Sequence, residues 1–195
     1  KYITEHTNDT IINNIFKRTL IYTEIRAIED ELALYQTSYK KMLEQFYIAN
    51  VLLTDLQSAE PYTYKRGKVY YNYLKANKGG IGLDGEINYK GIEQKYYSNT
   101  NGNSRLMKLS ADYINLKTTK PVNLTLIPAT LNTDMQMMLL KINFNSGEFA
   151  LQNIQKNTNN QYCTYIDSVS KYGTYLIIIK RFDKTYLSNA SFQYE

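Results

Sequence analysis

The sequence predicts an α+β fold in which one long N-terminal helix precedes a mostly antiparallel β-sheet domain. Glycine and proline are absent before Pro61, although the 195-residue chain holds 9 Gly and 3 Pro. Apolar side chains recur over residues 21–56 at alternating spacings of four and three. The later residues alternate β-branched and aromatic runs with turn residues, which is typical of strands. We therefore expect two segments, residues 1–60 (long and helical) and residues 61–195 (rich in β-strands).

The first segment is predicted to be a single helix. Asn8, Asp9 or Thr10 can cap its start, because short polar side chains accept hydrogen bonds from the free N–H groups of a first helical turn. The apolar stripe of residues 21–56 then keeps its repeat for 36 residues, which is typical of a coiled coil. A break near residues 36–38 is the alternative and would give a hairpin of helices; the unbroken repeat favours one helix.

The stripe changes in width along its length. From Met42 onward further apolar residues widen it, and a wide apolar face suits packing on a sheet. Its earlier, narrower part suits a partner helix. We therefore expect a partner interface made of Ile21, Ile25, Ile28, Leu32 and Tyr35. The alternative is that the whole stripe packs on its own domain.

The second segment is expected to form antiparallel strands joined by turns. Strand composition is found in residues 68–74, 86–97, 105–116, 122–127 and 173–182. Asn145-Ser146-Gly147 separates residues 138–144 from residues 149–154, which predicts a β-hairpin. Residues 134–142 fit a helix and a strand equally well.

Aromatic and basic residues alternate between positions 62 and 73. A protein surface that binds single-stranded nucleic acid or carbohydrate combines aromatic rings for stacking with cations. The candidate ligand surface comprises Tyr62, Tyr64, Lys65, Arg66, Tyr70, Tyr71 and Tyr73. The alternative is a loop and edge strand whose tyrosines cover the end of the helix. The net charge of +5 is otherwise scattered, so nucleic acid is not the favoured ligand.

The inventory of reactive side chains points away from catalysis. The chain has 1 His and 1 Cys, His6 and Cys163, so a zinc cage of cysteines and a disulfide framework are excluded. We expect His6 to be solvated and Cys163 to be a small buried side chain. Residues 80–85 match G-x-G-x-x-G, but a polar run precedes them and strand-like residues follow, so we expect a glycine-rich turn. No catalytic residue, cofactor or metal is therefore expected.

The architecture resembles parts of the type IV pilus and type II secretion machinery. A coiled coil over residues 21–56, followed by residues 122–127, 134–142, 148–155 and 175–180, looks like the inner-membrane assembly-platform protein of pili. That resemblance implies a short anchor, a ferredoxin-like β-α-β-β domain and a dimer. Residues 49–59 are also similar to the L-x-x-D-L-x-x-A stretch that ends the long helix of minor pseudopilins.

These observations predict a non-enzymatic structural component of a bacterial envelope or filament assembly. It would bind protein partners through the helix and through the sheet domain, with a homodimer as one arrangement. A minor pilin or pseudopilin subunit is the alternative. The chain has no apolar run long enough to span a membrane and begins with Lys. We therefore expect a trimmed or mature extracytoplasmic form, with a membrane anchor upstream.

Overall fold

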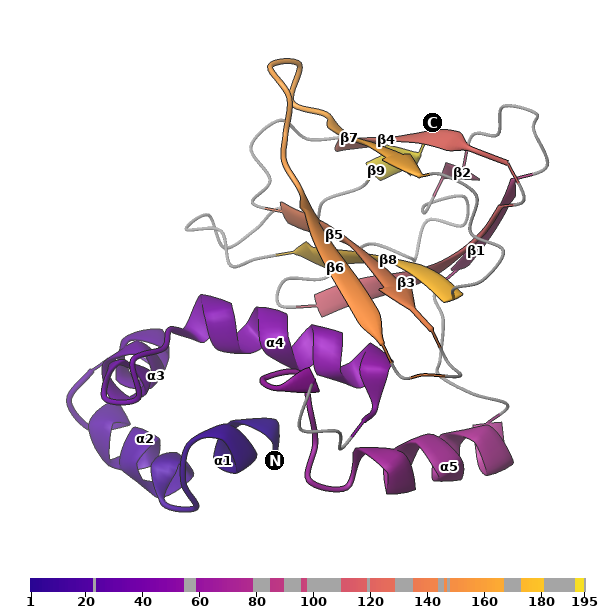
Figure 1. Ribbon diagram of the computed structural model, residues 1–195. Coiled ribbons are helices and arrows are strands. Elements are labelled where there is room, and N and C mark those ends of the chain that lie inside the picture. The colour runs from indigo at the N-terminus through magenta and orange to yellow at the C-terminus, as the bar shows by residue number, and fades with distance from the viewer. Residues whose placement is uncertain are drawn as a thin grey trace. The chain divides into compact units, whose positions relative to one another are not determined.

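The chain divides into two compact units, Lys1–Ile81 and Gly82–Glu195, which we call the helical unit and the sheet unit. The computed structural model describes residues 1–22, 24–54, 59–78, 85–89, 96–97, 110–118, 120–128, 135–143, 146, 148–166, 173–180 and 192–194. Helices and largely antiparallel sheets are both present, so the expected α+β class is confirmed (Figure 1).

One long helix does not form, and that expectation is wrong. The described part of the helical unit contains short helices instead (Figure 1). They are α1 (Tyr2–His6), α2 (Ile11–Thr19), α3 (Glu24–Ala33), α4 (Tyr39–Leu52) and α5 (Gly67–Lys78). Thr10 is the N-cap residue of α2, although its side chain makes no capping hydrogen bond.

Local backbone chemistry explains the break between α3 and α4. Gln36 has a φ of 55°, a left-handed conformation that a continuing helix does not contain. Ser38 then adopts an extended backbone, and its hydroxyl accepts a hydrogen bond from the Lys41 N–H at 3.2 Å. This N-cap starts α4 as a new helix. The break near residues 36–38, the alternative that the repeat disfavoured, is therefore the observed structure.

The apolar stripe lies largely in the core of the helical unit. The buried core residues are Tyr2, Ile11, Leu32, Met42, Ala49, Leu53 and Tyr64. Ile28, Tyr35, Tyr39 and Phe46 pack against them and are partly buried. The repeat of about 3.5 residues therefore marks the inward faces of α3 and α4, which are covered by other elements of the same unit.

Residues 68–74 form part of α5, and the expectation of a strand there is wrong. Tyr70, Tyr71 and Leu74 lie on one helical face and pack against the core, so tertiary contact outweighs the strand propensity of tyrosine. At the start of α5, a Cβ atom on Gly67 would lie 2.2 Å from the carbonyl oxygen of Thr54. Only glycine therefore allows α5 to begin against that backbone.

The sheet unit is a two-layer β-sandwich in the part that the structure describes. One sheet has the order β1-β3-β8-β5-β6, and the other has the order β2-β9-β4-β7. The β1–β3 pair is parallel and the other pairs are antiparallel. The strands are β1 (Gly85–Tyr89), β2 (Tyr96–Tyr97), β3 (Ser110–Thr118), β4 (Val122–Pro128), β5 (Met135–Ile142), β6 (Phe149–Ile154), β7 (Tyr162–Ile166), β8 (Gly173–Lys180) and β9 (Phe192–Tyr194).

The core of the sheet unit contains side chains from both sheets. Met137 and Leu139 of β5 meet Leu126 of β4 and Ile166 of β7 in one buried cluster. Residues 134–142 fitted helix and strand equally, and residues 135–142 of this range are a strand. The β-α-β-β arrangement implied by the pilus resemblance required a helix there.

The other strand expectations have mixed outcomes. The expected hairpin forms between β5 and β6, where the Asn143 N–H donates to the Glu148 carbonyl at 2.8 Å. The expectation for residues 122–127 is confirmed by β4. Residues 173–180 are a strand, but 181–182 lie outside the described residues. The same holds for residues 90–95, 105–109 and the glycine motif up to residue 84.

Candidate interaction sites on the helical unit

An apolar row runs along the solvent side of α2. Ile12, Phe16 and Leu20 are spaced by four, so they lie on one face of a helix, and Ile21 follows them. The exposed fractions are 40% for Ile12, 67% for Phe16, 86% for Leu20 and 76% for Ile21. We call these residues the apolar row. Single exposed apolar residues are common on proteins, whereas a contiguous group marks an interaction surface.

The opposite side of α2 already has a partner. Ile11 is fully buried, and Ile15 packs against the core of the helical unit. α2 is therefore held in place by one apolar face while it presents a second apolar face. The stripe predicted from the sequence starts at Ile21, so it includes only the last residue of this row. The signal was the spacing of Ile12, Phe16 and Leu20.

A polar contact fixes the position of α2 on α3. The Arg18 Nε donates to the Glu31 Oε2 at 2.7 Å, and the Asn14 Nδ2 donates to the Glu31 Oε1 at 2.9 Å. The Glu31 side chain is only 3% exposed. Burial by itself would raise the pKa of this carboxyl, but the two donors outweigh it and hold the pKa below its usual value. The charge is thus stabilised only while both helices are docked.

The five expected partner-facing residues are not equivalent. Leu32 is fully buried, and Ile28 and Tyr35 pack beside it in the core of the helical unit. Ile25 is partly buried, whereas Ile21 is exposed. Ile28, Leu32 and Tyr35, the last three of the five, contact their own unit, as the alternative interpretation held. Ile21 is the member that the structure leaves on the surface, beside the apolar row.

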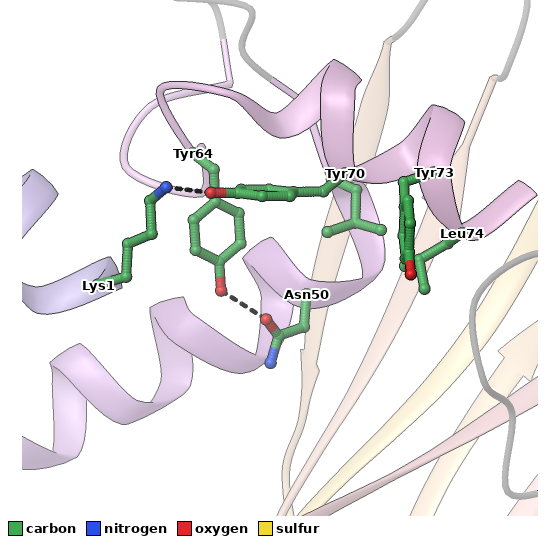
Figure 2. A pocket seen from close by; sticks show the side chains of 7 residues that line it. Lys1, Asn50, Tyr64, Tyr70, Tyr73 and Leu74 are labelled. Atoms are coloured by element: carbon green, nitrogen blue, oxygen red, sulfur yellow. Dashed lines mark hydrogen bonds between the residues drawn. The ribbon is translucent and has the colours of Figure 1, made fainter. Parts of the chain in front are cut away.

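A pocket of about 430 Å³ lies elsewhere on the helical unit. It is lined by Lys1, Asn50, Leu53, Tyr64, Tyr70, Tyr73 and Leu74 (Figure 2). Tyr70, Tyr73 and Leu74 come from α5, Asn50 comes from α4, and Tyr64 comes from the turn before α5. The pocket thus brings together three tyrosine rings, which are close to one another in sequence, with residues from the start of the chain and from α4.

Hydrogen bonds fix two of the three rings. The Tyr64 hydroxyl donates to the Asn50 Oδ1 at 2.5 Å, and the Lys1 Nζ donates to the Tyr70 hydroxyl oxygen. The Tyr64 and Tyr70 rings meet edge to face, with 5.8 Å between their centroids. Burial raises the pKa of Tyr64 to about 12, and the hydrogen bond to Tyr70 raises the pKa of the Lys1 ammonium. Tyr64 is therefore neutral and Lys1 charged at neutral pH.

The expected ligand surface at residues 62–73 is split by the helical conformation of α5. Tyr64, Tyr70 and Tyr73 line the pocket. Lys65 and Arg66 are exposed but do not line it, and Tyr71 packs against the core. Tyr62 is partly buried and also lies outside the lining. The three pocket tyrosines were in the expected set; Asn50 and Lys1 were not, because they are distant in sequence.

His6 and Cys163 both differ from expectation: His6 is largely buried and Cys163 is exposed. His6 lies beneath the Tyr2 ring, with centroids 4.3 Å apart, and its Nε2 is 2.9 Å from the Thr63 carbonyl oxygen. Its side chain is largely buried, so the expected solvated position is wrong. Cys163 is exposed on β7, so its expected burial is wrong as well. Among the described residues there is no group of three or more His, Cys, Asp or Glu that could hold a metal ion.

Helices of the described residues are all too short or too polar to cross a membrane. No protein-family model matches the chain, and no curated protein matches it. Among solved structures, the chain is similar to the pre-peptidase C-terminal domain of a collagenase from Bacillus anthracis. The similarity has a TM-score of 0.34 and 13% identity, over 58% of this chain and 93% of that domain. A similarity at this level carries no argument about function.

Proposed function

We propose that this protein is a non-enzymatic assembly component that associates with a second copy of itself through the apolar row of α2. The exposure of Phe16 and Leu20 on a helix whose other face is buried is the observation that carries the proposal. Burying one such side chain in a contact stabilises it by about 1.5–3 kcal/mol. A row of four therefore provides the apolar centre that a small dimer interface needs.

The charges of α2 and α3 favour a second copy as the partner. A twofold contact uses the same surface on both chains, so that surface must complement itself. α2 carries the exposed cation Lys17 and no acidic residue, whereas the partly exposed carboxylates of α3, which packs on α2, are Glu29 and Asp30. A twofold arrangement allows the basic helix of one copy to approach the acidic helix of the other.

The biological setting of this assembly is a separate part of the proposal. Membership of a type IV pilus or type II secretion machine was expected from one long coiled-coil helix, and the breaks between α2, α3 and α4 remove that basis. The proposal of an extracytoplasmic envelope assembly rests on the order of a helical unit followed by a β-rich unit. The non-enzymatic character rests on the inventory of one His and one Cys. His6, moreover, is held by its neighbours Tyr2 and Thr63.

Sedimentation velocity of the full chain over a range of concentrations tests this function. We expect a concentration-dependent dimer for the wild type and a monomer for Leu20→Glu, because a carboxylate in the apolar row must be desolvated on association. Val69→Glu is the matched control: Val69 is 60% exposed on a different helix, α5, and its variant should dimerise like the wild type. A wild type that stays monomeric, or a Leu20→Glu variant that dimerises normally, would overturn the proposal.

A further inference from the structure

The solvent side of α5 carries cations and no carboxylate. Residues 61–83 contain no Asp or Glu, and the excess of 23 Lys and Arg over 18 Asp and Glu in the chain comes from this segment. The exposed residues that matter here are Lys65, Arg66, Lys68, Val69, Lys75 and Ala76, which we call the basic face. We propose that the basic face binds the surface of a lipid bilayer that contains anionic phospholipids.

Neighbouring side chains leave the positive charge of this face in place. Among the described residues, no ion pair involves a cation of the basic face. The Glu5 carboxylate accepts from the Lys65 backbone N–H at 2.8 Å, but its side chain is 8% exposed and lies 3.6 Å from the Lys1 ammonium. The cations are therefore available to anionic headgroups, and each one near such a surface strengthens binding by roughly fivefold.

Aliphatic side chains lie beside the cations on the same side of α5. Val69 is 60% exposed and Ala76 is exposed as well, and residues seven apart complete two turns of a helix. Lys68 and Lys75 have the same separation, so a row of cations runs next to a row of aliphatic side chains. A helix with this pairing can lie in the plane of a membrane, with its apolar side chains at the acyl boundary and its cations at the phosphates.

The packing of α5 favours lipid over nucleic acid as the partner. A protein that binds single strands offers rings on which successive bases stack. Tyr70 and Tyr71 pack against the core of the helical unit, and Tyr64 is 7% exposed, so these rings are used inside the unit. Val69 and Ala76 cannot hydrogen-bond to phosphates or to base edges, whereas the acyl boundary of a bilayer accepts aliphatic groups.

Co-sedimentation of the full chain with lipid vesicles tests the charge. We expect binding to mixed vesicles of phosphatidylglycerol and phosphatidylcholine in equal parts, weaker binding as the salt concentration rises, and little binding to phosphatidylcholine alone. The double variant Lys68→Ala/Lys75→Ala should bind about twentyfold more weakly, because two cations are lost. Lys40→Ala/Lys41→Ala is the matched control: it removes the same charge from exposed positions on α4, and its affinity should stay close to that of the wild type.

A fluorescent reporter tests whether the aliphatic row enters the bilayer. The chain has no Trp, so Val69→Trp provides a single indole whose emission is read without background. We expect this emission to shift to shorter wavelength when the mixed vesicles are added, because the ring leaves water. Tyr165→Trp is the control, since Tyr165 is 61% exposed on β7 of the sheet unit, and its emission should not shift.

Several outcomes would overturn the proposal, and all of them are independent of whether the protein dimerises. Equal binding to neutral and mixed vesicles, or an unchanged affinity of Lys68→Ala/Lys75→Ala, would remove the basic face as the site. Vesicle binding that is lost in Leu20→Glu but kept in the lysine variant would place the membrane contact at the apolar row. Tighter binding of a short DNA duplex than of the mixed vesicles, through the same lysines, would identify nucleic acid as the partner.

Discussion

Arg18 of α2 and Glu31 of α3 form the polar contact that joins two helices which the sequence pattern placed in one continuous helix. Their side-chain atoms are 2.7 Å apart, and the carboxylate is almost completely buried. Such a contact requires residues 18 and 31 to lie side by side, whereas thirteen residues of continuous helix would separate them by about 20 Å. The pair is therefore a direct signature of the folded-back arrangement.

Arg18→Met should destabilise the protein by about 2 kcal/mol, because it leaves the Glu31 carboxylate buried with Asn14 as its remaining donor. Arg26→Met is the matched control. Its partner Asp30 is 3.8 Å away, and the two side chains are 66% and 39% exposed, so its loss should cost less than about 0.5 kcal/mol. Urea denaturation measures both values. Equal effects of the two variants would count against the buried contact.

Stability should fall in acid because of the same carboxylate. The pKa of Glu31 in the folded chain lies below its ordinary value of 4.5. Its contribution is therefore complete above about pH 4.5 and is lost as the pH falls through the lower folded pKa. Glu31→Gln should show a flatter dependence of the free energy of unfolding on pH below 4.5. A wild-type curve parallel to that of Glu31→Gln would contradict the lowered pKa.

Leu32 and Ile21 belong to one apolar stripe but should respond differently to truncation. Leu32 is fully buried in the core of the helical unit, so Leu32→Ala should destabilise it by about 3 kcal/mol through lost transfer energy and a cavity. Ile21→Ala should change stability by less than about 0.5 kcal/mol, because its side chain is exposed. Thermal unfolding of both variants, measured where the protein is monomeric, compares them. A large loss for Ile21→Ala would place that side chain in a core.

Cys163 should react in the native protein. It is exposed on β7, and its Sγ lies 3.5 Å from the Asn157 Nδ2 and 3.7 Å from the Thr125 Oγ1. We expect Ellman's reagent to titrate one thiol per chain without denaturant, and none in Cys163→Ser. Reaction that begins only at denaturing concentrations of urea would show that the thiol is buried.

The sequence identified the buried side of residues 28–53 but not what covers it. Leu32, Met42, Ala49 and Leu53 have coiled-coil spacing and are all buried, so the periodicity correctly marked a core-facing stripe. Periodicity reports which side of a helix is apolar; it does not report whether the helix continues. The sequence signal for the break was Ser38, a good N-cap residue, whereas the left-handed backbone of Gln36 is seen only in the structure.

Long-range contacts explain the remaining differences between the predictions made from the sequence and the observed structure. The tyrosines of residues 70–73 have strand propensity, but packing of Tyr70 and Tyr71 on the helical core determines their conformation. Three pocket tyrosines were recognisable as an aromatic cluster, whereas Asn50 and Lys1 join them only through the fold. In the sheet unit the hairpin of β5 and β6 was predictable, because its signal is local.

The contact between copies at α2 can be tested most directly by photo-crosslinking of the purified full chain. A benzophenone amino acid placed at position 16, in the centre of the apolar row, should give a covalent dimer on irradiation. The same amino acid at position 69 on α5, which is also exposed, should give little. Dimer formation from position 16 alone is the predicted result. Equal yields from both positions, or no dimer from position 16 at concentrations where the protein sediments as a dimer, would contradict an interface at the apolar row.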